Sequence, residues 1–178
     1  MIRTRVGYGG GTSDQPTYRN IGDHTETIQI DFDPKQITYR QLLGVYWDSH
    51  DPTFRSWSQQ YKSVIFFHDQ RQKRLAVETM EGEQARRGKK IFTEVLPVST
   101  FTRAEDYHQK YRLRQNRRLM SEFAMLLPSG ESFVNSTVAA RVNGFLGGYG
   151  KLETLRSEID SYGLSEKAKQ RLLNLFEP

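Results

Sequence analysis

The feature that most constrains the fold is a short run of uninterrupted apolar residues, Val64–Phe67. An unbroken run of this length predicts a β-strand buried on both faces, so other elements must cover each side of it. Helix signals flank the run. Before it, Thr38 and Gln41 have the spacing of a capping box, and after it Asp69 stands at the N-cap position of a helix that ends near Gly88.

Three further segments have the pattern of β-strands. Residues 2–6 and 28–32 alternate apolar and polar side chains, and residues 91–98 contain another candidate strand. The glycine-rich residues 7–11 and the polar residues 12–26 are predicted to form loops. The order strand, strand, helix, strand, helix, strand predicts an α+β fold, a two-layer α/β sandwich with a mixed or antiparallel sheet.

From about residue 104 onward the chain has a helical pattern. Residues 133–146 have an apolar face that ends at a pair of glycines, and two shorter helices are predicted around residues 152–159 and before residue 176. We therefore expect an α/β domain over residues 1–120 and a helical C-terminal extension over residues 121–178.

The composition excludes several kinds of site. The chain has no cysteine, which excludes disulfides, thiolate metal sites and a thiol nucleophile within it. Its four histidines are scattered, which disfavours a metal site. Residues 7–11 lack the Gly-Lys-Ser/Thr ending of a phosphate-binding loop. We expect no bound cofactor and no metal.

The formal net charge of +5 raises the question of nucleic-acid binding. One segment holds a cluster of basic residues: Lys110, Arg112, Arg114, Arg117 and Arg118. Because no nucleic-acid motif accompanies this cluster, a solvated helix face is the favoured interpretation, and a surface for acidic partners or nucleic acid is the weaker one. No apolar run approaches the ~20 residues of a membrane span, so we expect a soluble protein, with the cytoplasm as its default location.

Two loops beside strand starts carry the candidate site residues. Tyr18 and Glu26 lie in the polar loop before the strand at 28–32, and Tyr61 directly precedes the buried strand. A carboxyl group and phenols at neighbouring strand ends can act as a proton donor and as hydrogen-bond donors. The alternative is that they are ordinary polar surface residues.

Six blocks of sequence make this arrangement more specific. In chain order they are residues 7–11 (GYGGG), 16–18 (PTY), 22–26 (GDHTE), 46–52 (YWDSHDP), 60–63 (QYKS) and 104–111 (AEDYHQKY). Their order and spacing resemble the successive signature blocks of the A-type peptide methionine sulfoxide reductases. The resemblance covers roughly residues 1–115, and the helical tail resembles an extension found in one branch of that family.

The resemblance implies a ferredoxin-like α+β roll and a definite reaction. In the family, a cysteine thiolate attacks the sulfur of an S-epimer methionine sulfoxide. Positions matching Tyr18, Glu26 and Tyr61 hold the sulfoxide oxygen, and the carboxyl group supplies a proton. Methionine leaves, a sulfenic acid remains on the cysteine, and thioredoxin restores the thiol. The implied partners are thus oxidised methionine, in proteins or free, and thioredoxin.

The sequence departs from the family at the nucleophile. The Gly-Cys-Phe-Trp block of the family would lie before Gly7 and is absent, and Ser56-Trp57-Ser58 stands where some members carry an acidic residue. We expect no reductase activity from this chain alone. We interpret the chain either as a truncated reductase or as a cysteine-free module that binds methionine sulfoxide or peptides or has a regulatory role. Loss of a strand and a helix is also expected to expose a sheet edge and apolar surface, which favours aggregation or oligomers.

Overall fold

The first strand runs further than the sequence predicts. The computed structural model describes residues 2–176, and in it β1 (Arg3–Gly9) includes glycines that the sequence assigns to a loop. β1 pairs antiparallel with β5 (Phe101–Arg103), with Gly7 opposite Arg103 and Gly9 opposite Phe101. A Cβ on Gly7 would clash with the Thr102 carbonyl oxygen. These glycines therefore permit a close strand pairing and do not end the strand.

Five strands form two separate pieces of sheet. β2 (Thr25–Asp31) completes a three-stranded sheet of order β2-β1-β5, whereas β3 (Val64–Phe67) and β4 (Glu94–Pro97) form a parallel pair. The predicted α+β class is confirmed, with antiparallel pairing in the first sheet and parallel pairing in the second. The short β5 is not anticipated by the sequence, because three residues carry too little alternation to be recognised.

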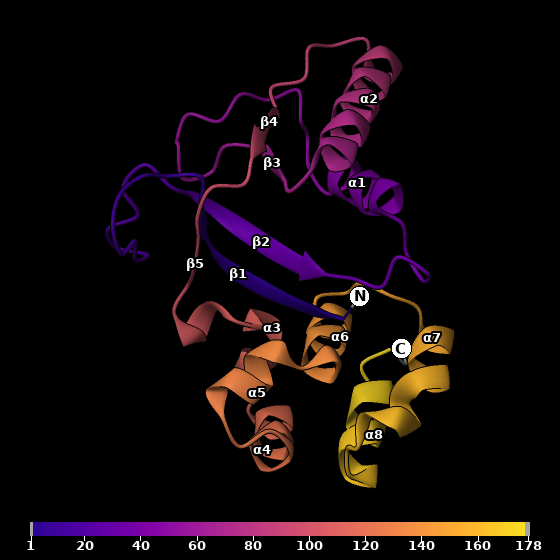
Figure 1. Cartoon of the computed structure of the whole chain (residues 1–178). Coiled ribbons are helices and arrows are strands. Elements are labelled where there is room, and N and C mark those ends of the chain that lie inside the picture. The colour runs from indigo at the N-terminus through magenta and orange to yellow at the C-terminus, as the bar shows by residue number, and fades with distance from the viewer. Residues whose placement is uncertain (1, 177–178) are drawn as a thin grey trace. The chain divides into compact units, whose positions relative to one another are not determined.

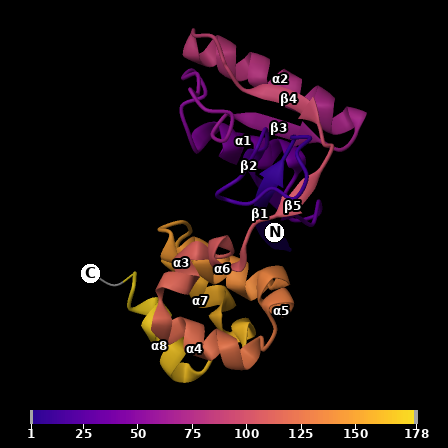
Figure 2. The ribbon, with the colours of Figure 1, turned by 90° about the vertical axis from the view of Figure 1, so that its left-hand side faces the viewer.

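Two helices cover the β3–β4 pair (Figure 1). They are α1 (Tyr39–Asp48) and α2 (Gln70–Arg87). α2 contacts both strands and α1 packs on α2. Figure 1 and Figure 2 both show α2 lying along the strands. Thr38 forms the predicted capping box, and α2 ends at Gly88, whose φ of 62° is left-handed. The core beneath the helices consists of Leu43, Trp47, Ile65, Ala76 and Ile91.

The apolar face predicted for residues 28–32 is only partly covered. Ile28 is 56% exposed, and Ile30 and Phe32 are of intermediate exposure. These side chains line an open cavity of about 460 Å³, together with residues of α1 and β3. The expectation of a half-buried strand is therefore wrong for Ile28, because its face of β2 borders this cavity, which we call the β2–β3 groove.

By its contacts the chain divides into two compact units, residues 6–104 and residues 2–5 with 105 onward. The second unit is helical, as predicted. Its helices are η1 (Asp106–His108), α3 (Tyr111–Gln115), α4 (Arg117–Leu126), α5 (Gly130–Asn135), α6 (Thr137–Leu146), α7 (Leu152–Glu158), η2 (Ile159–Tyr162) and α8 (Glu166–Leu173). The predicted helix at 133–146 is split, because Ser136 caps α6 by accepting a hydrogen bond from the Ala139 amide.

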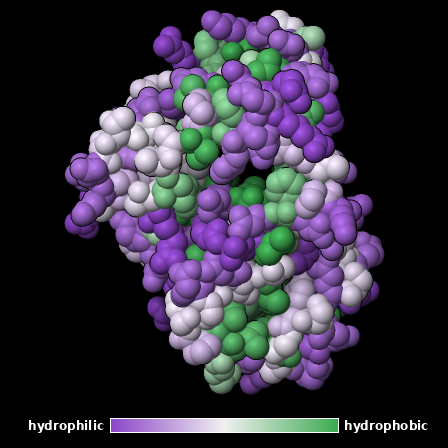
Figure 3. All heavy atoms as spheres, viewed as in Figure 1, coloured by the Kyte–Doolittle hydropathy of each residue, from purple (hydrophilic) through white to green (hydrophobic). Residues whose placement is uncertain are grey.

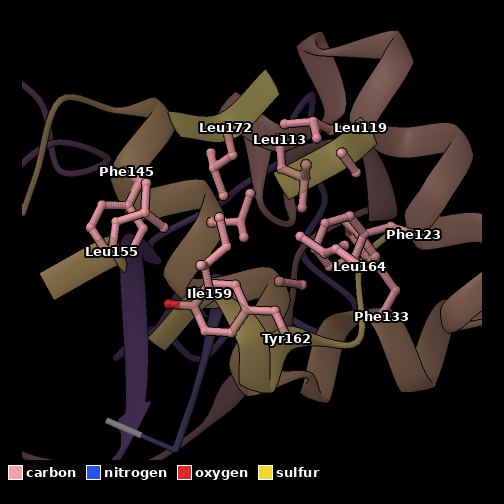
Figure 4. Close-up of a cluster of buried hydrophobic side chains, with 13 residues drawn as sticks. Leu113, Leu119, Phe123, Phe133, Phe145, Leu155, Ile159, Tyr162, Leu164 and Leu172 are labelled. Atoms are coloured by element: carbon pink, nitrogen blue, oxygen red, sulfur yellow. The ribbon is translucent and has the colours of Figure 1, made fainter. Parts of the chain in front are cut away.

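Large apolar side chains converge at the centre of the helical unit (Figure 4). Phe123 and Phe133 meet edge to face with ring centroids 6.1 Å apart, and Leu113, Leu155 and Leu172 of the same cluster are fully buried. This cluster stabilises the unit chiefly by removing apolar area from water.

The basic cluster is not uniformly solvated. Arg112, Arg117 and Arg118 are exposed, but Lys110 is only 4% exposed and donates hydrogen bonds to the carbonyl oxygens of Thr4 and Val134. The prediction of a solvated basic face is therefore wrong for Lys110, whose burial depends on contacts distant in sequence. Most of the face shown in Figure 3 is hydrophilic, with hydrophobic residues in patches, in line with the mean hydropathy of −0.71.

Candidate functional site

The loop that carries Tyr18 is held in place by Asp23. The Asp23 carboxylate accepts hydrogen bonds from the backbone amides and the hydroxyl groups of Thr12 and Ser13, at 2.7–3.0 Å. The Ser13 side-chain and backbone bonds, followed by those of Thr12, hold the pKa of Asp23 far below its usual range. At the tip of the loop, Thr17 and Asn20 exchange two backbone hydrogen bonds of 3.1 Å, and Tyr18 lies between them.

The buried side chain of His24 ties the two ends of the same loop together. Its Nδ1 accepts a hydrogen bond from the Gly11 amide at 3.2 Å, so Nε2 carries the proton and donates to the Ser13 carbonyl oxygen at 2.9 Å. His24 is therefore a structural residue. Its neighbour Thr25 begins β2, and Glu26 follows directly.

Glu26 is joined to the segment that carries Tyr61. The Glu26 amide donates to the Gln60 carbonyl oxygen at 3.0 Å, and Gln60 Nε2 donates back to Glu26 Oε1 at 2.8 Å. The Thr25 hydroxyl donates to the Gln59 carbonyl oxygen at 3.0 Å. These bonds link residues more than thirty positions apart in the sequence, and they place the start of β2 beside the start of β3.

The phenol of Tyr61 lies near both other candidates. Partial loss of solvation, then the negative charge of Glu26, and then the charge of Tyr18 and a hydrogen bond with it raise the pKa of Tyr61. The side chains of Tyr18 and Tyr61 are 44% and 50% exposed. The structure thus brings Tyr61 close to both Glu26 and Tyr18 in an exposed part of the chain.

The β2–β3 groove adjoins this cluster. Glu26 forms part of its wall, and most of the remaining wall is apolar, with Ile28, Leu42, Val64 and Phe66 among its residues. A polar cluster at the mouth of an apolar cavity is the usual arrangement of a small-molecule binding site.

Two other sequence predictions concern metal binding and membrane-spanning helices. Within residues 2–176 there is no group of three His, Cys, Asp or Glu side chains that could hold a metal. His50 lies just beyond the end of α1, and its Nδ1 bonds to the Tyr46 carbonyl oxygen at 3.0 Å. Within the same residues, no helix is both long enough and apolar enough to cross a membrane.

Sequence reasoning missed the residue that orients the carboxyl group. In the sequence Gln60 stands out only as part of the block 60–63, but in the structure its side-chain amide donates a hydrogen bond to Glu26. The sequence shows Gln60 only as a polar residue shortly before a strand. That it bonds to Glu26 becomes apparent only when the start of β2 lies beside the segment before β3.

Two protein-family models match the chain. A model described as peptide methionine sulfoxide reductase matches residues 1–141, and one described as the helical domain of selenoprotein methionine sulfoxide reductase A matches residues 129–172. Together they span both the strand-containing part and most of the helical part.

Curated relatives agree with the family models. The chain is 40% identical over 172 residues to a Drosophila melanogaster peptide methionine sulfoxide reductase, covering 96% of this chain and 69% of the relative. It is 40% identical over 151 residues to peptide methionine sulfoxide reductase A5 of Oryza sativa, covering 82% of this chain and 59% of the relative. It is 44% identical over 123 residues to MsrA of Methanococcoides burtonii, covering 62% and 80%.

Solved structures give the same result for the fold. Reduced Mxr1 of Saccharomyces cerevisiae superposes with a TM-score of 0.59 at 30% identity, covering 64% of this chain and 70% of that one. Methionine sulfoxide reductase A of Corynebacterium diphtheriae superposes with a TM-score of 0.53 at 31% identity, covering 64% and 63%.

Proposed function

The chain belongs to the peptide methionine sulfoxide reductase family, and from that premise we propose that Tyr18, Glu26 and Tyr61 bind the sulfoxide oxygen of oxidised methionine. The observation that carries the proposal is the convergence of these three side chains from the loop before β2, the start of β2 and the segment before β3. Support also comes from the adjoining groove, because its largely apolar wall suits the apolar part of a methionine side chain.

The three side chains suit the charge that develops in the reaction. As a thiolate sulfur bonds to the sulfoxide sulfur, the sulfoxide oxygen gains negative charge. Donors already aimed at that oxygen stabilise it, and the Glu26 carboxyl group is the one that delivers the proton the oxygen takes up. In this proposal the phenols of Tyr18 and Tyr61 donate hydrogen bonds to the oxygen, and Gln60 fixes the orientation of Glu26.

The nucleophile is not among these 178 residues, since the sequence has no cysteine. Serine is a poor substitute, because attack on the sulfoxide sulfur needs a soft nucleophile that can afterwards be reduced. Turnover at this site therefore needs a thiol from outside this sequence. In the full reaction that thiol becomes a sulfenic acid as methionine leaves, and thioredoxin reduces it with release of water.

The second candidate function is non-catalytic. The chain would then bind methionine sulfoxide, alone or in a peptide, or act as a regulatory module. The absence of any cysteine is the observation that favours it. Both candidates share the binding step and differ only in whether a thiol is supplied.

We further propose that the sulfoxide site belongs to a domain of residues 1–120, with residues 121–178 as a helical extension. In support, all three site residues precede position 120, and the helical family model begins at residue 129.

The test of the binding step uses N-acetyl-methionine-(S)-sulfoxide methyl amide and calorimetry. Replacing a single hydrogen-bond donor to a charged or strongly polar oxygen is expected to weaken binding roughly tenfold, so Glu26→Ala and Tyr61→Phe should each do so. Tyr149→Phe is the matched control, since Tyr149 is 77% exposed and lies in the helical unit. Equal affinity in all four proteins would refute the proposed binding site.

The activity prediction needs a separate measurement. The purified chain, supplied with thioredoxin, thioredoxin reductase and NADPH, is expected to give no sulfoxide-dependent NADPH oxidation. Turnover by this chain alone would refute the need for an external thiol.

A further inference from the structure

An exposed tryptophan stands beside the candidate site with no contribution to the core. Trp57 is 86% exposed, and its ring meets the ring of Tyr61 edge to face, with centroids 6.4 Å apart and planes inclined by 64°. Phe54, in the same loop, is 70% exposed. Large exposed aromatic side chains grouped at a site are characteristic of surfaces that bind polypeptides.

The backbone that presents Trp57 is held firmly. The Ser58 amide donates to Ser56 Oγ at 3.2 Å, and the Ser56 hydroxyl donates to the Ser58 carbonyl oxygen at 2.9 Å. The Tyr61 amide also donates to the Ser58 carbonyl oxygen, at 3.3 Å. The turn is therefore formed before any ligand arrives, so little conformational entropy is lost when a ligand packs on the indole.

The spacing of the two rings matches that of an extended peptide. Each residue of an extended chain advances about 3.3 Å, and alternate side chains point to the same face. Side chains two positions apart therefore stand roughly 6.6 Å apart on one face, close to the 6.4 Å between the Tyr61 and Trp57 rings. An extended peptide whose oxidised methionine side chain lies over the Tyr61 ring would therefore place a second side chain over Trp57.

We propose that Trp57 binds an apolar side chain two residues from the methionine sulfoxide of an extended polypeptide, and so favours peptides that carry such a side chain. This inference rests on the proposed sulfoxide site, because the register is counted from Tyr61. Trp57 acts here as a specificity-determining residue and takes no part in the chemistry.

The test compares two pentapeptides with blocked ends, Leu-Gly-MetO-Gly-Leu and Gly-Gly-MetO-Gly-Gly, both with the S-sulfoxide. The symmetric design offers leucine to Trp57 in either chain direction. By calorimetry the leucine peptide is expected to bind roughly five- to tenfold more tightly. Trp57→Ala should abolish that preference while leaving the affinity for the glycine peptide within about twofold. Tyr149→Ala, another exposed aromatic, should leave the preference intact.

Fluorescence provides a second readout. The chain has two tryptophans, and Trp47 is buried, so a change in emission on adding the leucine peptide reports mainly on Trp57. A blue shift that the glycine peptide does not cause is expected. If both peptides bind equally to the unaltered chain, or if the preference survives in Trp57→Ala, the inference is overturned while the sulfoxide site stands. If neither peptide binds, the proposed function falls together with it.

Discussion

The burial of Lys110 leads to a quantitative prediction about stability. Its ammonium group, inside the helical unit, donates to the carbonyl oxygens of Thr4 and Val134, the second at 2.9 Å. Burial, followed by the positive charges of Arg5 and Arg114, lowers the pKa of Lys110 from 10.5 to about 8. A charged lysine in this position costs folding free energy, and the cost disappears when the group is neutral.

The size and sign of the effect follow from proton linkage. Between pH 8 and 10.5 the unfolded chain binds more protons at this residue than the folded chain, so the free energy of unfolding rises with pH. Below pH 8 the cost is fully present, and by pH 10.5 most of it has gone. Integration over a window from about pH 7.5 to 9.5 gives a gain of about 2 kcal/mol.

Urea unfolding followed by circular dichroism at the two ends of that window measures this gain. Lys110→Met should remove the rise with pH, whatever its effect on absolute stability, because the titrating group is gone. Lys151→Met is the matched control, since Lys151 is an exposed lysine of the same unit, and it should keep the rise. A pH dependence that is the same in Lys110→Met and in the unaltered chain would refute the reasoning.

Three further predictions concern packing, charge and association. Phe123→Ala removes a fully buried ring that contacts Phe133, and it should lower the free energy of unfolding by about 3–5 kcal/mol; Met125→Ala, in the same helix but 74% exposed, should change it by less than about 0.5 kcal/mol. Arg141→Ala leaves the partly buried Glu158, which also accepts a hydrogen bond from Tyr162 at 2.7 Å, without its guanidinium partner. It should cost about 1–3 kcal/mol, measured by the same unfolding assay and diminished by salt. The apolar β2–β3 groove should bind a hydrophobic dye and promote concentration-dependent association in sedimentation experiments; a monomer with no dye binding and one sharp thermal transition would contradict this expectation.

Local sequence signals predicted the parts of the fold that depend on local interactions. The capping box at Thr38 and the left-handed end of α2 at Gly88 were predictable, because each involves residues within one helical turn. The extension of β1 through Gly7 was not, since the reason for it is β5, which arrives from the far end of the same unit. The prediction that Lys110 is exposed failed for the same reason. Its position among basic residues suggested exposure, but in the structure it is buried and bonds to Thr4 and Val134, which are distant in the sequence.

The candidate site was predictable as a set of residues but not as a geometry. Tyr18, Glu26 and Tyr61 were selected largely because their sequence blocks resemble those of a family. Which groups orient them depends on the approach of β2 to the segment before β3, and no local pattern records that approach. The position of Trp57 beside Tyr61 also depends on a turn whose hydrogen bonds involve ordinary serines.

The way these segments are joined bears on what a cysteine-free chain can still do. The Tyr18 loop is joined to the Tyr61 segment through Gln59, whose Nε2 donates to the Asp23 carbonyl oxygen at 3.2 Å, and β2 is joined to it through the Glu26 amide. None of these hydrogen bonds involves a thiol or any group outside residues 11–61. These contacts hold the Tyr18 loop, Glu26 and the Tyr61 segment together, so we expect methionine sulfoxide to bind in the absence of a thiol.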